Sequence, residues 1–240
     1  MAKKSQKSQT RARRATPRAA PVRPARGRRA QQAAGSSYHH GALRDALLEA
    51  AERVLERDGL PGLTLRAVAR EAGVSHAAPT HHFGDLTGLV SELAAIGFRQ
   101  FNAAMAAASA PGALPMASAK AYVAYAQAHP GMYGLMFRSE RLDYSRPSLH
   151  EAAETSFAGL AGSIGANRHE EIAKDALTLD QAAAIARAWS LVHGFTMLLL
   201  DDRLSDILER SPEGTDAETL LEAMLKATVF KPPSSQLHDL

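Results

Sequence analysis

Apolar residues recur at helical spacing along most of the chain after residue 40. In the first such run, residues 42–59, they stand three and four positions apart, at Leu43, Leu47, Ala50, Ala51, Val54 and Leu55. Residues at this spacing share one face of an α-helix, so the run predicts an amphipathic helix with a buried face. Gly59 is predicted to end it, because glycine readily takes the left-handed conformation found at helix C-termini.

Two shorter helices joined by a tight turn are predicted next. Thr64 precedes an apolar-periodic run as its N-cap, and Gly73 ends that run. Ser75 is then predicted to cap a short helix from His76 to Phe83. Two short helices that cross over such a turn form a helix-turn-helix.

Longer helices are expected in the rest of the chain. Asp85 is an N-cap candidate for a helix over residues 86–108, and the prolines of residues 110–115 break the pattern after it. Further helices are predicted at residues 115–128, 131–138, 147–164, 169–176, 179–203 and 215–230. Thr178 and Thr215 each stand three residues before a Gln or Glu, the spacing of a capping box.

The composition agrees with an all-α fold. Apolar residues make up 45% of the chain and aromatic residues only 5%, whereas sheets favour aromatic and β-branched side chains. No stretch has the alternating pattern of a strand. The chain contains no cysteine, which excludes disulfides and cysteine-based metal sites.

The charge is distributed unevenly. Residues 1–40 hold 11 of the 28 Lys and Arg residues and no acidic residue, which leaves 17 basic residues against all 25 acidic ones in the remainder. A basic segment on an acidic body points to a polyanionic partner. Residues 1–37 lack apolar periodicity and are predicted to form a disordered tail. No signal-peptide pattern and no run of 18 apolar residues is present, so we expect a cytoplasmic protein without a membrane span.

The segment VSHAAPTHHFGDL, residues 74–86, carries the candidate chemistry. A short helix can enter the DNA major groove, where short or flat side chains meet base edges. Phe83 is expected to anchor this helix in the core. The residues predicted to read bases are Ser75, His76, Ala77, Thr80 and His81.

The histidines of this segment have two alternative interpretations, as metal ligands or as acid–base groups. His76 and His81 are five positions apart, whereas helical ligand pairs stand three or four apart. The sequence offers no nucleophile with a base and an orienting group, and no phosphate loop. We therefore predict no metal, no cofactor and no enzymatic activity. Each histidine taken alone fits an ordinary solvated side chain equally well.

From Tyr38 to Val90, the run YHHGALRDALLEAAERVLERDGLPGLTLRAVAREAGVSHAAPTHHFGDLTGLV resembles the DNA-binding domain of TetR-type (tetracycline-repressor) transcriptional regulators. The first helix, the turn, the recognition helix and its closing aromatic occur in the same order. The segments HPGMYGLMF (129–137) and AWSLVHGFTMLLL (188–200) resemble the C-terminal domain of one branch, named for a Trp-His-Gly signature. Here those residues are Trp189, His193 and Gly194.

This resemblance implies a homodimer that binds a double-stranded DNA operator and releases it when a small-molecule effector binds. The predicted domains are a tail (1–37), a three-helix helix-turn-helix DNA-binding domain (38–84) and a larger helical ligand-binding and dimerisation domain (85–240). Dimerisation is expected on residues 179–203 and 215–230. Acting through its tail alone, the chain would instead be a non-specific, nucleoid-type DNA-binding protein.

The chain departs from the family pattern at two phosphate-contacting positions. Many members have an aromatic residue at the position of Thr80 and a lysine at that of Leu86. Phosphate contacts are therefore predicted elsewhere, with the basic tail contributing through counterion release. The predicted phosphate-binding residues are Tyr38, His39, His40, Thr64, His82, Arg28 and Arg29.

The aromatic and methionine residues of the C-terminal domain are the candidate effector site. Trp189, His193 and Met197 stand four apart and share one helix face. An apolar wall with an indole N–H and an imidazole suits an apolar ligand with one polar group, although the same stripe is also typical of plain core. The predicted ligand-binding residues are Tyr122, Tyr125, Tyr133, Met136, Phe137, Trp189, His193 and Met197.

Overall fold

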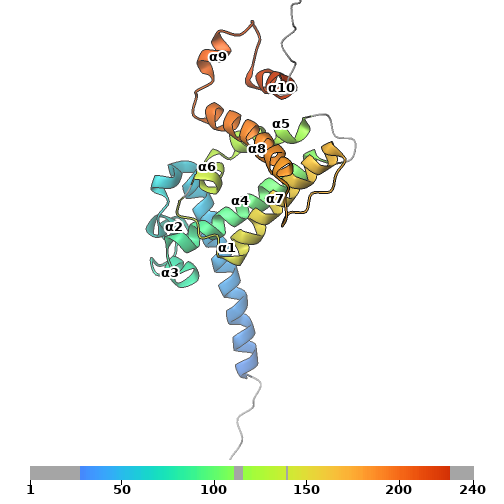
Figure 1. Ribbon diagram of the computed structural model, residues 1–240. Coiled ribbons are helices and arrows are strands. Elements are labelled where there is room, and N and C mark those ends of the chain that lie inside the picture. The colour runs from blue at the N-terminus through green and yellow to red at the C-terminus, as the bar shows by residue number, and fades with distance from the viewer. Residues whose placement is uncertain (1–27, 111–115, 139, 228–240) are drawn as a thin grey trace, which may run out of the picture. The chain divides into compact units, whose positions relative to one another are not determined.

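The computed structural model describes residues 28–110, 116–138 and 140–227, with side chains from Gly41 onward except Arg138. Within these residues every regular element is a helix (Figure 1). The helices are α1 (Arg28–Gly62), α2 (Leu65–Glu71), α3 (Ala78–Phe83), α4 (Leu86–Ala108), α5 (Ala117–Ala128), α6 (Pro130–Arg138), α7 (Pro147–Arg168), α8 (Leu179–Leu200), α9 (Ser205–Glu209) and α10 (Ala217–Ala227). The predicted all-α fold, a helix-turn-helix followed by a larger helical region, is confirmed.

Helix α1 buries the apolar face that its sequence pattern predicted. Leu47, Val54 and Leu55 are fully buried in the core that begins at this helix. Gly59 has φ 68° and ψ −177°, so it breaks the regular helix where the sequence placed a cap. The backbone is already helical at Arg28, inside the segment predicted to be a tail, and residues 1–27 lie outside the described part of the chain.

The turn between α2 and α3 is fixed by backbone hydrogen bonds around one glycine. The Val74 N–H donates to the Ala69 carbonyl at 3.0 Å and the Gly73 N–H to the Arg70 carbonyl at 3.2 Å, the paired bonds of a Schellman motif. Gly73 has φ 68°, the left-handed conformation that this motif requires. At the other end of α2, the Thr64 hydroxyl accepts the Ala67 N–H at 3.1 Å, which confirms Thr64 as the N-cap.

The predicted start of the third helix was wrong. Helix α3 begins at Ala78, and its N-cap residue is Ala77, which makes no side-chain capping bond. His76 lies in the preceding turn, and the Ser75 carbonyl, not its hydroxyl, accepts the Ala78 N–H at 3.0 Å. Pro79 explains the later start, because a proline without an N–H fits best in the first turn of a helix.

Helix α4 is the central element of the unit that begins at Ala42. It contacts α3, α5, α6 and α7, and α7 lies along it (Figure 1). The Asp85 carboxylate accepts the Gly88 N–H at 2.7 Å and caps the helix as predicted. At Gly97 the helix α6 approaches so closely that an added Cβ would stand 2.6 Å from Met132 Sδ.

The second half of the chain follows the predicted pattern with three corrections. Residues 169–176 form no helix, because α7 continues to Arg168 and ends on His169 in the left-handed conformation, φ 56°. The short helix α9 was not predicted. The capping box at Thr178 is present, but α10 is capped by Asp216, which accepts the Thr219 N–H at 2.8 Å. The Thr215 hydroxyl instead donates to the Pro212 carbonyl at 2.7 Å.

Helix α8 carries apolar side chains on more of its circumference than the other described helices cover. By length and composition alone it is also the one described helix able to cross a membrane, although the core helix of a soluble protein passes the same test. Trp189 and Leu198 are each 47% exposed, and Leu179 at its start is 89% exposed. The described part of the chain therefore leaves a broad apolar face of α8 open, with Trp189 and Leu198, half a turn apart around the helix, at its two edges.

Replacing Gly73 with alanine is expected to destabilise the protein by about 1–2 kcal/mol, the cost of a side chain in the left-handed conformation. No atom lies within 4 Å of the added Cβ, so the loss measures backbone strain rather than a clash. Gly134, inside α6 with equally open space, is the control, and its change to alanine should be neutral or stabilising by about 0.5–1 kcal/mol. Urea denaturation of both variants tests this, and equal effects would contradict it.

Candidate functional site

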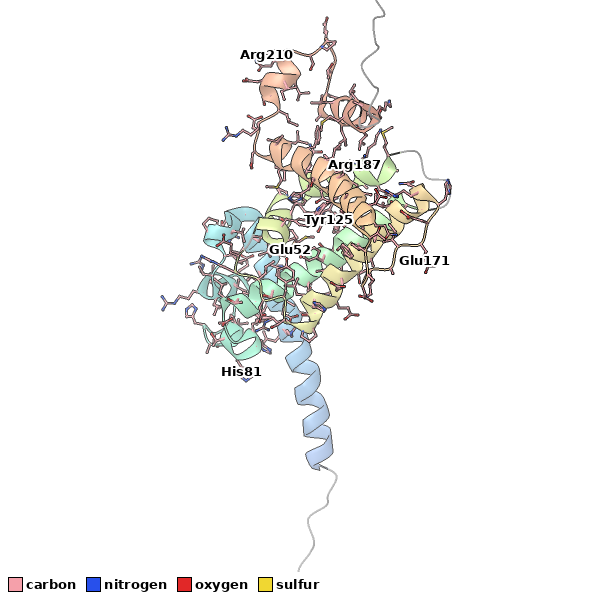
Figure 2. The ribbon with its side chains drawn as sticks, viewed as in Figure 1. Glu52, His81, Tyr125, Glu171, Arg187 and Arg210 are labelled. Atoms are coloured by element: carbon pink, nitrogen blue, oxygen red, sulfur yellow. The ribbon has the colours of Figure 1, made fainter. Side chains whose placement is uncertain are left out.

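One surface of α3 and the turn before it presents the residues predicted to read bases. Ser75, His76, Ala77, Thr80 and His81 are all exposed. Figure 2 shows His81 projecting away from the helices. The buried side of the same helix carries Pro79 and Phe83. The short helix thus separates an anchoring face from a face that can meet a partner.

Phe83 is held by a chain of contacts that reaches three other helices. Its ring is 4% exposed, and the Arg44 guanidinium lies over it at 5.4 Å from the ring centroid. Arg44 of α1 also donates to Glu92 of α4 at 2.6 Å, and Ser148 of α7 donates to the same carboxylate at 2.9 Å. The predicted role of Phe83 as an anchor is confirmed.

The angle of α2 is fixed by ion pairs to α1. Arg53 Nε and Arg57 Nη1 lie 3.1 Å and 2.9 Å from the Glu71 carboxylate, and Arg57 also pairs with Asp58. Hydrogen bonds from Arg57 and then Arg53 lower the pKa of Glu71. These arginines are engaged within the helix-turn-helix. Arg66 of α2 is exposed and forms no ion pair with the described residues, so it is a basic candidate that the sequence analysis did not select.

The predicted phosphate-binding residues are only partly described. Thr64 is exposed; its oxygen accepts a backbone N–H as the cap, so its hydroxyl proton is the group that can be donated to a phosphate. The half-buried His82 packs against the rings of His81 and Phe83, at 5.4 Å and 6.3 Å between centroids. The side chains of Tyr38, His39, His40, Arg28 and Arg29 lie outside the described residues.

Three of the predicted ligand-site residues form a polar triangle between α5, α6 and α8. The Tyr122 and Tyr133 hydroxyls lie 2.9 Å and 2.8 Å from His193 Nδ1, and Tyr133 donates to the Tyr122 oxygen at 3.2 Å. Both tyrosines are buried. Burial raises the pKa of Tyr122, opposed by its hydrogen bonds with Tyr133 and Trp189.

A hollow of about 360 Å³ opens beside this triangle. It is lined by Met136, Phe137, Tyr144, Trp189, Ser190 and His193. Four of these six are residues that the sequence analysis selected. Ser190 and Tyr144 were missed; Tyr144 lies in the segment between α6 and α7, where no helical periodicity could have pointed to it.

Tyr125 and Met197 do not line the hollow. Tyr125 is buried (Figure 2) and donates to the Gly97 carbonyl at 3.1 Å; burial raises the pKa of its phenol. Met197 packs against the main hydrophobic core. The core alternative that the sequence left open therefore describes these two residues better.

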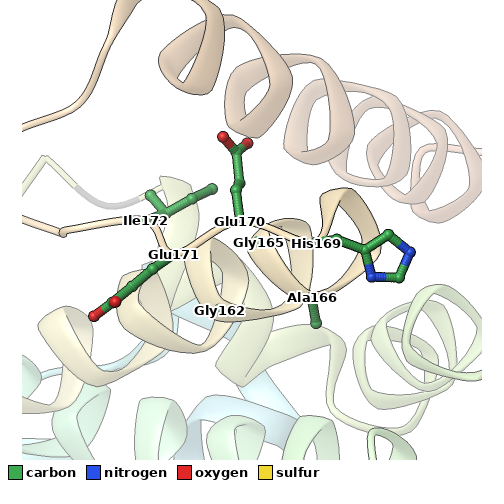
Figure 3. A pocket seen from close by; sticks show the side chains of 7 residues that line it. All are labelled: Gly162, Gly165, Ala166, His169, Glu170, Glu171 and Ile172. Atoms are coloured by element: carbon green, nitrogen blue, oxygen red, sulfur yellow. The ribbon is translucent and has the colours of Figure 1, made fainter.

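A second hollow, of about 540 Å³, lies at the end of α7 (Figure 3). It is lined by Gly162, Gly165, Ala166, His169, Glu170, Glu171 and Ile172. Although it contains a histidine and two carboxylates, no group of three metal-binding side chains occurs among the described residues. It has no aromatic wall apart from the His169 ring, so the hollow at His193 is the better ligand site.

Two family models match the chain. Residues 47–93 match the bacterial regulatory proteins of the tetR family, and residues 116–228 match the tetracyclin repressor-like C-terminal domain. The first match contains α2 and α3, and the second contains α5, α6, α8 and the polar triangle. Trp189, His193 and Gly194 all lie in α8, and membership of the Trp-His-Gly branch stays a prediction.

Solved structures share the fold. A protein with unknown function from Rhodococcus sp. RHA1 is 33% identical over 78% of this chain and 93% of its own, with a TM-score of 0.61. The candidate regulatory protein SCO4313 is 24% identical over 80% and 98%, with a TM-score of 0.64. A candidate tetR family transcription regulator from Shewanella sp. PV-4 is 21% identical over 77% and 97%, with a TM-score of 0.52.

No curated protein matches the chain significantly. The family rests instead on the two model matches, which lie on the helix-turn-helix and on the helical region after it. With an all-helical fold and an exposed recognition helix, the chain belongs to the TetR family of transcriptional regulators.

Proposed function

We propose that the protein is a repressor that binds a palindromic operator as a homodimer and leaves it when a small molecule enters the hollow at His193. The observation that carries this proposal is the set of contacts that α6 makes. One short helix contacts the helix-turn-helix at its start and the polar triangle in its middle, and it thereby links the two sites that such a repressor needs.

On DNA, the exposed residues of α3 would read bases while its buried residues hold the helix in place. Thr80 and His81 offer a hydroxyl, a methyl group and ring nitrogens to base edges. Thr64 and Arg66 would contact phosphates beside the groove. The basic residues at the start of the chain add affinity that is independent of sequence.

The open apolar face of α8 supports a homodimer. Trp189, Leu198 and Leu179 would otherwise remain in water, and association is stabilised when apolar surface is removed from water. A dimer with two-fold symmetry presents two identical recognition helices, which matches a palindromic operator. This surface favours a dimer over a monomer that reads a single half-site.

Effector binding would reach the DNA-binding helices through α6. At the start of α6, the Met132 N–H donates to the Glu56 carboxylate of α1 at 3.2 Å, and a Cβ on Gly131 would stand 3.0 Å from the Leu55 carbonyl. One residue after Met132, Tyr133 lies against His193. A ligand that displaces Tyr133 would therefore move a helix bonded to α1. Release follows only if the ligand binds the displaced form better.

Replacing Thr80 and His81 together with alanine is expected to relax sequence preference and to leave affinity for random DNA within about twofold. Each lost base contact costs roughly 1–3 kcal/mol of discrimination, whereas phosphate contacts are unchanged. Selection from a randomised duplex pool near physiological salt measures both quantities for wild type and variant. The control is Arg66→Ala, which should weaken binding to all sequences alike.

Wild-type protein should enrich a palindrome in that selection. Tight binding without enrichment would assign the DNA affinity to the basic tail and contradict direct reading by α3.

Replacing Leu198 with glutamate is expected to raise the dimer dissociation constant at least tenfold, because a charge at an apolar interface loses its water. The control, Arg99→Glu at an exposed position of α4, introduces the same side chain on another helix. Analytical ultracentrifugation across a concentration series measures the constant. A monomeric wild type, or equal effects of both changes, would contradict dimerisation through this face.

Replacing Glu56 with glutamine is expected to reduce the change in operator affinity that the effector causes. The amide keeps the shape of the carboxylate but loses the charge that favours a helix N-terminus. The hydrogen bond from α6 to α1 is therefore weaker, and a movement of α6 displaces α1 less. Operator titrations with and without effector measure the coupling. The control, Glu49→Gln, lies on the exposed side of the same helix, and equal coupling in both variants would remove Glu56 from the path.

A further inference from the structure

The Arg146 guanidinium lies at the C-terminal end of α3, the helix that carries the exposed reading face. A Cβ added to Gly88, in the first turn of α4, would stand 2.7 Å from Arg146 Nη2 and 2.0 Å from the Phe83 carbonyl oxygen. Both atoms are this close to one point, so they are neighbours in space. Arg146 itself is the N-cap residue of α7. The fold therefore brings a cation from the segment before α7 to the last residue of α3.

This guanidinium lacks a hydrogen-bond acceptor among the described residues. Its Nε is buried and unpaired, and Oδ2 of Asp143 is 3.6 Å from it, beyond hydrogen-bonding distance. The other carboxylate oxygen of Asp143 accepts the N–H and the hydroxyl of Ser145, at 3.0 Å and 2.6 Å. The Arg146 side chain is 32% exposed, so an acceptor can reach the guanidinium from outside the protein.

A purely structural role for Arg146 is the alternative. A cation beside the last carbonyl groups of a helix stabilises that helix, and the Phe83 carbonyl is such a group. This role leaves the buried Nε donor unbonded, and an arginine offers five N–H donors in a planar fork. A ligand with several oxygen atoms in one plane or tetrahedron would use more of them.

The end of α3 is where such a ligand is expected when the helix reads bases. Six helical residues span about 9 Å, less than the ~12 Å width of the major groove. The early residues of a recognition helix face the bases, so its C-terminal end lies toward a wall of the groove, which is made of phosphates. A guanidinium binds two phosphate oxygens at once. The carboxylate of Asp85 close by is already bonded to the Gly88 N–H at 2.7 Å, and the N-terminus of α4 offsets its charge.

We propose that Arg146 binds a phosphate of the DNA backbone at the edge of the groove that α3 enters. The DNA-binding surface thus includes a residue from outside the predicted DNA-binding domain of residues 38–84. This inference rests on the proposed function, in which α3 reads the operator. Tyr144, two residues before Arg146 in the sequence, lines the hollow at His193, so one short segment carries a residue of each candidate site.

Replacing Arg146 with glutamine is expected to weaken binding to every DNA sequence by about three- to tenfold near physiological salt, the counterion-release effect of one phosphate contact. The slope of log affinity against log salt concentration should fall by about one, and the preferred sequence should not change. Arg146→Lys, which keeps the charge, should restore the slope. Fluorescence anisotropy with the full chain across a salt series measures all of these quantities.

The control is Arg99→Gln, which removes the same charge from an exposed position further along α4 and should leave the slope unchanged. Thermal unfolding of each variant shows whether the fold is kept. An unchanged salt slope in Arg146→Gln, or an equal change in Arg99→Gln, would overturn the proposal.

The phosphate itself is identified with duplexes in which one backbone phosphate at a time is replaced by a neutral methylphosphonate. At one position in each half-site, the replacement should weaken wild-type binding about as much as Arg146→Gln does, and it should change binding of that variant by less than about twofold. A purely structural arginine would give no such position, because its loss acts on α3 and not on a single phosphate.

The possible failures are distinguishable. If the wild type enriches a palindrome and no phosphate depends on Arg146, this inference is wrong and the proposed operator binding stands. If the wild type enriches no sequence, reading by α3 is wrong, and the contact proposed for Arg146 falls with it.

Discussion

The α-carbon of Gly97 lies where a side chain would collide with α6, since a Cβ there would stand 2.6 Å from Met132 Sδ and 2.8 Å from Met136 Sδ. The carbonyl of the same residue accepts the Tyr125 hydroxyl of α5. One position on α4 thus fixes its distance to two neighbours. Tyr122 lies one turn before Tyr125, and Tyr133 directly follows Met132. Their meeting at His193 therefore depends on how closely α6 packs on α4, as does the bond between α6 and Glu56.

The recognition helix depends on the same framework from the other side. Its six residues are too few to be stable alone, so Phe83 and Pro79 must hold it to the core. Arg44 covers Phe83 and pairs with Glu92, which Ser148 of α7 also contacts. A change in the spacing of α4 and α7 would therefore act on the support of α3. Helix α3 contacts α4, and Phe101 of α4 packs against Tyr122 and Phe137 beside the hollow, so both candidate sites depend on this helix.

Features decided by neighbours in sequence were predictable, and features decided by distant contacts were not. The caps at Thr64, Asp85 and Thr178 follow from a side chain reaching a backbone group three residues on. The capping role of Ser75 failed because Pro79 sets the start of α3. Asp216 took the role of Thr215, since both side chains suit a cap and the adjoining turn at Pro212 engages the threonine. Periodicity also gave no sign that α7 would continue to Arg168.

The same division applies to the candidate sites. The exposed face of α3 could be assigned from spacing only in part. Helix geometry places His81 opposite Phe83, but Thr80 stands three positions from Phe83, a spacing that shares a face, so its exposure follows from the packing of the folded chain. The aromatic stripe of α8 could not be divided into core and hollow, since Met197 and His193 have the same periodicity and differ only in what packs against them. Tyr144 needed the folded chain, which brings a connecting segment against α8.

The exposed face of α3, which we propose reads bases, has a consequence for how such a regulator diversifies. Substitutions at exposed positions usually change stability by no more than about 0.5 kcal/mol, so mutation can try many side chains at His76, Thr80 and His81 without loss of the fold. Tyr122 and Tyr133 are buried and share one nitrogen, and a change at either leaves polar groups unpaired. Under the proposed function, the operators of gene duplicates would therefore drift apart quickly, while the chemical signal to which the copies respond would be inherited with little change.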